Sequence, residues 1–135
     1  MYAGSVLKSM LGMTVDSRLP ATLVPVDRIL MRWAVAIGDS LPREAWDEPR
    51  FSRPPPLDDE TAIVVDQIVL RSPPKTRKFV QRWYKTPLPN SVLAKEFGMT
   101  ERSLIQCWQI SLYFLGARFE NSGNATLLTI LKIQR

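Results

Sequence analysis

Six basic side chains lie close together in the segment RSPPKTRKFVQRWYK, residues 71–85, which contains no Asp or Glu. Five of them follow one another at steps of four, three, four and three residues: Arg71, Lys75, Lys78, Arg82 and Lys85. On a helix this spacing aligns the side chains along one face. Phosphate groups are the natural ligands of such a row of cations. The alternative is a solvated face that is balanced by acidic groups elsewhere in the fold.

Residues for covalent catalysis are scarce. The chain has no His and one Cys, Cys107, which excludes a His-assisted nucleophile and a Cys/His zinc site. It also lacks a Walker loop and a dinucleotide-binding fingerprint. The densest carboxylate cluster, Asp58, Asp59 and Glu60, directly follows three prolines, where carboxylates cap the start of a helix. We therefore expect no enzyme, no cofactor and no metal site, with hard-metal binding at this cluster as the alternative.

Charge is divided unevenly along the chain. Residues 1–70 hold seven Lys or Arg and ten Asp or Glu, a balance of −3, whereas residues 71–135 hold eleven and three, a balance of +8, which together give the net +5. This division is typical of a nucleic-acid-binding half joined to a different interaction surface. No apolar run approaches the ~18 residues that cross a bilayer, and the first residues make a poor signal peptide. We therefore expect no membrane contact and a cytoplasmic location.

The segment NSVLAKEFGMTERSLIQCWQ, residues 90–109, has the pattern of a helix-turn-helix. Ala94 is the small residue where two helices would touch, Gly98 accepts the positive φ of the turn, and Thr100 suits the cap of the second helix. The apolar residues expected to close the small core are Leu93, Phe97, Leu104 and Cys107 or Trp108. The alternative is a helical hairpin with the same turn and no nucleic-acid partner.

The second helix of this motif would present polar side chains to the major groove of DNA, where Arg suits guanine, Gln suits adenine and Glu accepts from cytosine. The predicted base-reading residues are Thr100, Glu101, Arg102, Ser103, Gln106 and Gln109. The predicted phosphate contacts are Arg71, Lys75, Arg77, Lys78, Arg82, Lys85 and Lys95. Because only Arg102 is basic in the reading face, we expect the phosphate contacts to supply most of the affinity.

The elements that must position these residues are predicted to be helices, and the fold class is all-α. We expect a helical domain of about five helices, with the helix-turn-helix toward its C-terminal end. The helices are expected over about residues 25–40, 57–70, 74–84, 89–97 and 100–119. Residues 41–56 are proline-rich and predict a long irregular loop.

The predicted domain therefore covers residues 25–119. Residues 1–24 are expected to form an N-terminal arm. Residues 120–135 are expected to form a C-terminal tail after the break at Asn121–Asn124, and the apolar pattern of this tail is ambiguous between helix and strand.

Several short motifs follow one another in a particular order. They are the MRW of Met31–Trp33, the acidic helix start Asp58–Glu60, the pair Val65 and Asp66, the double proline Pro73 and Pro74, the aromatic Tyr84 that ends the basic helix, and the helix-turn-helix stretch Leu93–Leu104. In this order the chain resembles the late-gene antitermination protein Q of lambdoid-type bacteriophages, in its small, zinc-free branch. The resemblance covers about residues 25–119, and in that branch the helix-turn-helix is similar to the sigma-factor region that reads promoter DNA.

The resemblance implies a transcription antitermination factor without covalent chemistry. Such a protein binds double-stranded DNA near a late promoter, engages paused host RNA polymerase and its sigma factor, and makes the polymerase read through terminators. Its place of action would be the cytoplasm of the bacterial host, near the RNA exit channel, where nascent RNA would be a further contact. The acidic half and the proline-rich loop are the predicted polymerase contacts.

Two other functions remain open. A helix-turn-helix transcriptional repressor or activator would use the same motif but would need a dimer surface. An RNA polymerase- or sigma-binding protein would use the basic row against an acidic protein and would show no sequence-specific DNA binding.

Overall fold

The computed structural model describes residues 19–37, 55–85 and 88–133, and within these ranges it contains only helices and turns. The elements are η1 (Ala21–Leu23), α2 (Val24–Ala36), α3 (Asp59–Leu70), α4 (Pro74–Lys85), α5 (Asn90–Glu96), α6 (Glu101–Asn121) and α7 (Ala125–Ile133). The all-α prediction is confirmed. The described residues hold one α-helix more than the five expected, because the ambiguous tail contains α7.

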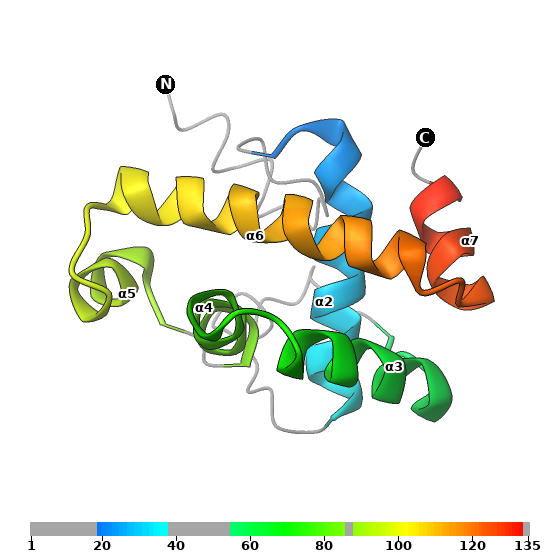
Figure 1. Ribbon diagram of the computed structural model, residues 1–135. Helices are drawn as coiled ribbons and strands as arrows, with labels where there is room; N and C mark the ends of the chain where they lie inside the picture. Colours follow the sequence, from blue (N-terminus) through cyan, green and yellow to red (C-terminus); the bar gives the residue numbers. More distant parts are fainter. Residues whose placement is uncertain (1–18, 38–54, 86–87, 134–135) are drawn as a thin grey trace, which may run out of the picture.

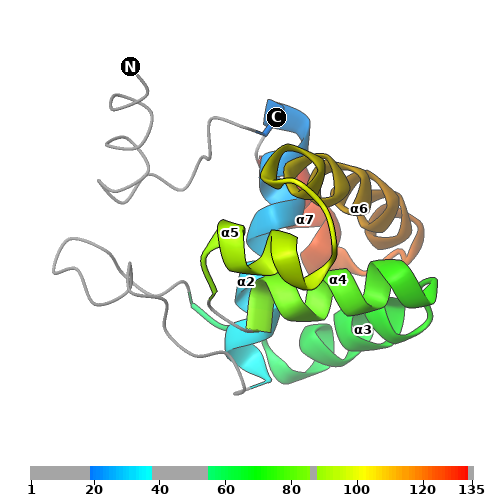
Figure 2. The ribbon, with the colours of Figure 1, turned by 90° about the vertical axis from the view of Figure 1, so that its left-hand side faces the viewer.

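The long helix α6 spans the molecule and contacts all the other helices (Figure 1). In that view α2 crosses behind α6, and α3, α4 and α5 lie below it, whereas α7 closes the end where α6 stops. Figure 2 shows the same arrangement from the side, with α3 and α4 next to each other and α5 to their left, on the side nearer the viewer. The basic helix and the glycine turn therefore lie at one end of α6.

Local sequence signals determine where most of these helices begin. Asp58 caps α3, because its side chain accepts a hydrogen bond of 3.1 Å from the Thr61 amide. The Thr61 hydroxyl donates to the same carboxylate at 2.7 Å, and these bonds to Thr61 lower the pKa of Asp58 from its usual value. The carboxylate cluster thus has the capping role, and the described residues contain no group of acidic, Cys or His side chains that could hold a metal ion.

The core is built around α2 and α6. Each of the six described α-helices contributes fully buried side chains: Ile29, Leu30 and Trp33 in α2, Val65 and Val69 in α3, Val80 in α4, Leu93 in α5, Leu104, Leu112, Leu115 and Phe119 in α6, and Leu127 in α7. Burial of this kind is the main favourable contribution to folding. None of the helices in the described ranges has both the length and the apolar character needed to cross a membrane.

The packed domain extends beyond the predicted limits of 25–119 at both ends. At the first end, Leu19 and Leu23 belong to the core, so residues 19–24 are not an arm. At the other end, Leu127, Ile130 and Leu131 are buried, because their spacing of three and one places them on the side of α7 that covers α2 and α6. The first α-helix begins at Val24 and ends at Ala36, with Ile37 as its C-cap, so it stops before the predicted end near Ser40. Residues 1–18 and most of the proline-rich segment 41–56 lie outside the described residues.

Candidate nucleic-acid interface

The turn between α5 and α6 has the predicted backbone geometry. Gly98 has φ +69, and the amide of Met99 donates to the Ala94 carbonyl at 2.9 Å, which closes the turn. Thr100 caps α6 by accepting a hydrogen bond of 3.1 Å from the Ser103 amide. Leu93 and Leu104 are fully buried on either side of this turn. The glycine turn and the cap of α6 are therefore as predicted, whereas a helix-turn-helix that binds DNA remains a prediction.

The structure narrows the set of side chains that could read bases. Glu101, Arg102 and Gln106 are exposed on the first turns of α6. Thr100 is also exposed, but its hydroxyl is engaged at the cap and lies 3.1 Å from the Ser103 hydroxyl. Ser103 and Gln109 are half-buried, and Gln109 has an interaction within the protein. Arg102 and Gln106, four residues apart on one face, are the best placed for a partner.

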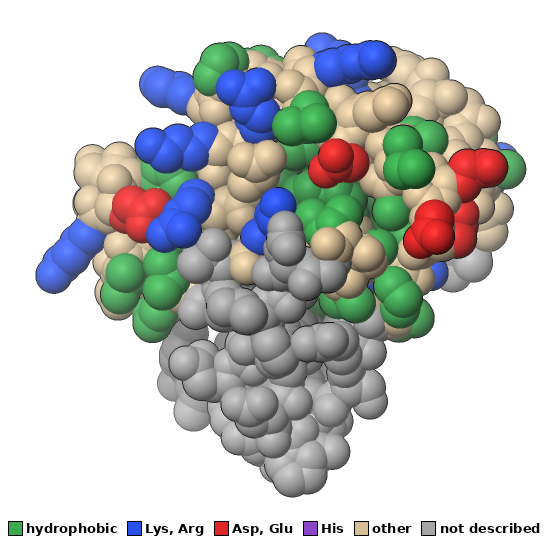
Figure 3. Space-filling model, turned by 90° about the horizontal axis from the view of Figure 1, so that it is seen from below, with side chains coloured by type: hydrophobic (Ala, Val, Ile, Leu, Met, Phe, Trp, Pro, Cys, Tyr) green, Lys and Arg blue, Asp and Glu red, His purple; other side chains and the backbone are tan. Residues whose placement is uncertain are grey.

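Exposed lysines lie on the two helices α4 and α5, both of which pack against α6. Lys75 and Lys78 lie on α4, and Lys95 lies in the last turn of α5. Figure 3 shows the molecule from below, with Lys and Arg side chains gathered over the end formed by α4 and α5. Acidic side chains lie mainly toward the opposite end of this view, where α3 begins with Asp59 and Glu60. We call Lys75, Lys78 and Lys95 the basic face.

The other predicted phosphate contacts lie in different surroundings. Arg77 donates from Nη1 to the Leu70 carbonyl at 3.1 Å, so it satisfies the end of α3. Lys85 places Nζ 5.9 Å from the centre of the buried Trp33 ring, a cation–π contact. Arg71 is not part of the α4 row, because it caps the end of α3 before the double proline and lines a hollow together with Arg118 of α6. The sequence could not separate these roles, since each depends on a neighbour from another part of the fold.

Arg82 forms the ion pair that links α4 to α5. Its Nη2 lies 2.6 Å from Oε1 of Glu96 and its Nε lies 2.7 Å from Oε2, a two-bond arrangement. Both side chains are about one-third exposed, 33% and 34%. The hydrogen bonds raise the pKa of Arg82 and lower that of Glu96. Arg82 therefore meets a carboxylate within the protein, at the edge of the basic face.

A chain of hydrogen bonds behind the basic face connects three helices. Trp108 Nε1 of α6 donates to the Tyr84 hydroxyl of α4 at 2.9 Å, and that hydroxyl donates to the buried Asp27 carboxylate of α2 at 2.5 Å. Trp108 also stacks on Trp83, with ring centroids 4.7 Å apart. These contacts hold α4 against α6, which fixes the helix that carries Lys75 and Lys78 relative to the helix that carries Arg102 and Gln106. Sequence reasoning missed them, because Tyr84 and Asp27 lie 57 residues apart.

Comparison of this chain with known protein families, curated proteins and solved structures gives no match. The functional argument therefore depends on the positions of its own side chains.

Proposed function

We propose that this chain is a phage transcription antitermination factor. It binds double-stranded DNA near a late promoter, engages paused host RNA polymerase with its sigma factor, and makes the polymerase read through terminators in the cytoplasm of the bacterial host. The observation that carries the DNA-binding part is that Arg102 and Gln106 are exposed at the start of α6, the helix that packs on α4 and α5, which carry the lysines of the basic face. The order of motifs described above supports antitermination over an ordinary repressor.

The side chains divide into two groups by the part of DNA that each can contact. Lysine ammonium groups on α4 and α5 attract phosphates of any sequence and position the protein on the duplex. Arg102 can then form paired hydrogen bonds to guanine and Gln106 to adenine in the major groove. Glu101 accepts from cytosine and repels phosphate, so it favours a particular base while limiting the total affinity.

Transcription with host polymerase tests the proposal most directly. The template carries the cognate phage late promoter and a downstream intrinsic terminator, and run-off products are measured with and without the protein. We expect terminator readthrough that disappears when the promoter-proximal DNA is replaced. Unchanged termination with altered initiation would instead favour a repressor, an activator or a polymerase-binding protein.

Binding measurements on the same DNA separate the two groups of side chains. Arg102→Ala should cost about 1–3 kcal/mol of binding free energy on the cognate site and relax one base preference, whereas Lys78→Ala should weaken all sequences and flatten the salt dependence. Lys132→Ala is the matched control, since Lys132 is exposed in the last turn of α7, away from α4 and α5. If Arg102→Ala and Lys78→Ala act alike on all sequences, the assigned roles are wrong.

A further inference from the structure

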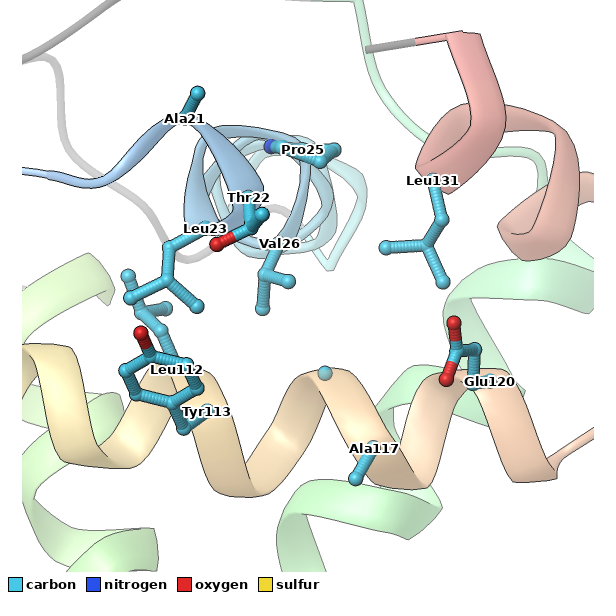
Figure 4. Close-up of a pocket in the computed structure, with 11 residues that line it drawn as sticks. Ala21, Thr22, Leu23, Pro25, Val26, Leu112, Tyr113, Ala117, Glu120 and Leu131 are labelled. Carbon is cyan, nitrogen blue, oxygen red and sulfur yellow. The ribbon is translucent and has the colours of Figure 1, made fainter. Parts of the chain in front are cut away.

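Two hollows adjoin the second half of α6, on different sides of this helix. The first is an apolar groove of about 620 Å³ between η1, the start of α2, α6 and α7 (Figure 4). Among the described residues that line it, Glu120 is the only charged one. The second, of about 310 Å³, lies between α3 and the end of α6, and its polar lining residues are Gln67, Arg71, Arg118, Asn121 and Ser122. We call this second one the arginine hollow.

The arginine hollow brings two guanidinium groups together without a carboxylate. Arg71 is the C-cap of α3, Arg118 lies in the last turn of α6, and both side chains are exposed. No acidic residue lines the hollow in the described part of the chain, and neither arginine has an ion pair with a described carboxylate. An anion that enters the hollow is therefore attracted by both guanidinium groups at once.

The ends of the two helices offset only part of this positive charge. A helix C-terminus carries roughly −0.5 elementary charge, so the ends of α3 and α6 together offset about half of the charge of Arg71 and Arg118. The hollow keeps a net charge of about +1. Stabilisation of the helix ends thus accounts for part of the charge and leaves the rest for a ligand.

The Arg118 side chain is held in place by an aromatic ring. Its guanidinium carbon lies 4.8 Å from the centre of the Phe114 ring, one turn earlier on α6, in a cation–π contact. A guanidinium group packed over a ring can still donate hydrogen bonds, because its five N–H groups point outward in its own plane. Arg118 is therefore positioned before a ligand arrives, which lowers the entropic cost of binding.

The donors of the hollow come from two directions and favour a phosphate group. Arg71 and the Gln67 amide belong to α3, whereas Arg118 and the Asn121 amide belong to α6. A tetrahedral phosphate presents oxygens in several directions and pairs with arginine through two hydrogen bonds, whereas the oxygens of a carboxylate lie in one plane. The Ser122 hydroxyl is engaged at the end of α6, where it donates to the Phe119 carbonyl at 2.6 Å.

The apolar part of the hollow is fixed by the core. Its two apolar lining residues, Val64 and Ile68, are half-buried and pack against the buried residues of the fold. Close packing of this kind resists deformation. The side of α3 that faces the hollow therefore keeps its shape when a ligand binds, and its apolar surface suits the sugar that is attached to a backbone phosphate.

We propose that the arginine hollow binds a phosphate group of a nucleic-acid backbone, as a contact separate from the basic face. The nature of the ligand as nucleic acid rests on the proposed function, whereas the preference for phosphate rests on the donors of the hollow. Arg118 follows Arg102 by sixteen residues on α6, a separation of about 24 Å along the helix. The phosphate in the hollow therefore lies well away from the bases that Arg102 reaches.

The test measures binding of the full chain to a late-promoter duplex and to a single-stranded RNA of the same length, at several salt concentrations. Replacing Arg71 and Arg118 together by Gln should weaken binding to at least one of them by about threefold to tenfold. The slope of log K against log salt should fall by about 0.9 for the duplex or about 0.7 for the RNA. The nucleic acid whose binding weakens identifies the source of the phosphate.

Single variants distinguish a shared phosphate from a loss of charge. If both arginines hold one phosphate, Arg71→Gln and Arg118→Gln should each cause most of the loss seen in the double variant. Arg118→Lys keeps the charge but loses the paired donors, so it should restore only part of the affinity. Lys132→Gln is the matched control, because it removes one exposed positive charge on α7, outside the hollow.

Four outcomes would overturn the inference. Equal Kd values for the double variant and Lys132→Gln on both nucleic acids, with the effect of Arg102→Ala on base preference intact, would reject the hollow and leave the proposed function standing. A lowered melting temperature of the double variant without loss of binding would show that the arginines only stabilise the helix ends. Loss of binding to a polyglutamate peptide alone would identify an acidic protein as the partner. Failure of the wild type to bind either nucleic acid would reject both the inference and the DNA-binding part of the proposed function.

Discussion

The two ends of α6 present surfaces of opposite kinds. At its start, the exposed side chains Glu101, Arg102 and Gln106 are polar and lie beside the basic face. From its middle onward, Ile110 and Tyr113 are exposed and Gly116 forms the floor of an apolar groove. Electrostatic attraction to phosphates is long-ranged and falls with salt, whereas apolar burial acts only at contact. Contacts made at the two ends of this helix would therefore respond differently to salt.

The largest expected effect comes from removing the basic face. Replacing Lys75, Lys78 and Lys95 together by Gln should reduce DNA affinity at least about tenfold and lower the slope of log K against log salt by about 0.9 per lost phosphate contact. Titrations of labelled DNA at several salt concentrations measure this. A slope equal to that of the wild type would show that these lysines do not contact phosphate.

In the apolar part of α6, substitution of Gly116 is expected to lower the stability of the fold most. Gly116→Leu should destabilise the fold by about 1–3 kcal/mol, because the added side chain cannot fit beside Val26 without moving α2. Gly116→Ala should cost less, since the helix preference of Ala, about 1 kcal/mol over Gly, offsets part of the clash. Urea unfolding of both variants gives the difference. Equal stability of the Leu variant and the wild type would show that α2 and α6 do not approach as closely as described.

Two glycines with nearly the same backbone conformation precede and follow α6, and substituting each of them allows the two ends of the helix to be compared. Gly98 and Gly123 have φ +69 and +71, and an added Cβ would meet nothing within 4 Å at either position. Gly98→Ala and Gly123→Ala should therefore each cost about 1–2 kcal/mol from backbone strain alone. Only Gly98→Ala should also weaken sequence-selective DNA binding, because it alters the turn that leads into α6. A similar loss of DNA binding for Gly123→Ala would point to general destabilisation.

The smallest effect concerns the ion pair at the edge of the basic face. Arg82 lowers the pKa of Glu96 from its usual 4.5, so the stability gained from the pair is present above that pH and is lost as pH falls through the lower, folded-state value. Acid should therefore destabilise the wild type more steeply below pH 4.5 than it destabilises Glu96→Gln. Thermal melting between neutral and acid pH measures the difference. Glu96→Gln also removes a negative charge at the edge of the basic face and should bind DNA slightly more tightly. Parallel dependences of the melting temperature on pH for Glu96→Gln and the wild type would contradict the assigned role of the pair.

The sequence was informative where the structure is determined locally. The caps at Asp58 and Thr100 and the turn at Gly98 follow from the preferences of single residues for particular backbone geometries. The buried face of α2, with Ile29, Leu30 and Trp33, follows from its apolar spacing. These features gave the all-α class and most helix boundaries within two residues.

The remaining features depend on contacts between distant parts of the chain. The row of cations looked continuous, yet Arg82 meets Glu96 across two helices, and Arg77 reaches back to Leu70. The apolar pattern of residues 125–133 suited a helix or a strand equally, and packing against α2 and α6 determined the outcome. The groove brings η1 together with α6 and α7, which no local pattern indicates.

Because α6 is a single uninterrupted helix, the distance between its two ends is fixed. Its 21 residues form one helix of about 30 Å, with Arg102 near one end and Glu120 near the other. A rigid helix of this length fixes both the distance and the angle between the molecules that bind at its two ends. Under the proposed function, the position of the protein on its DNA site would therefore determine where along the promoter it can capture a polymerase. Inserting a few base pairs between the DNA site and the position of the paused polymerase should prevent capture. The insertion would do so first by rotating the protein around the DNA axis, and only at greater lengths by increasing the distance.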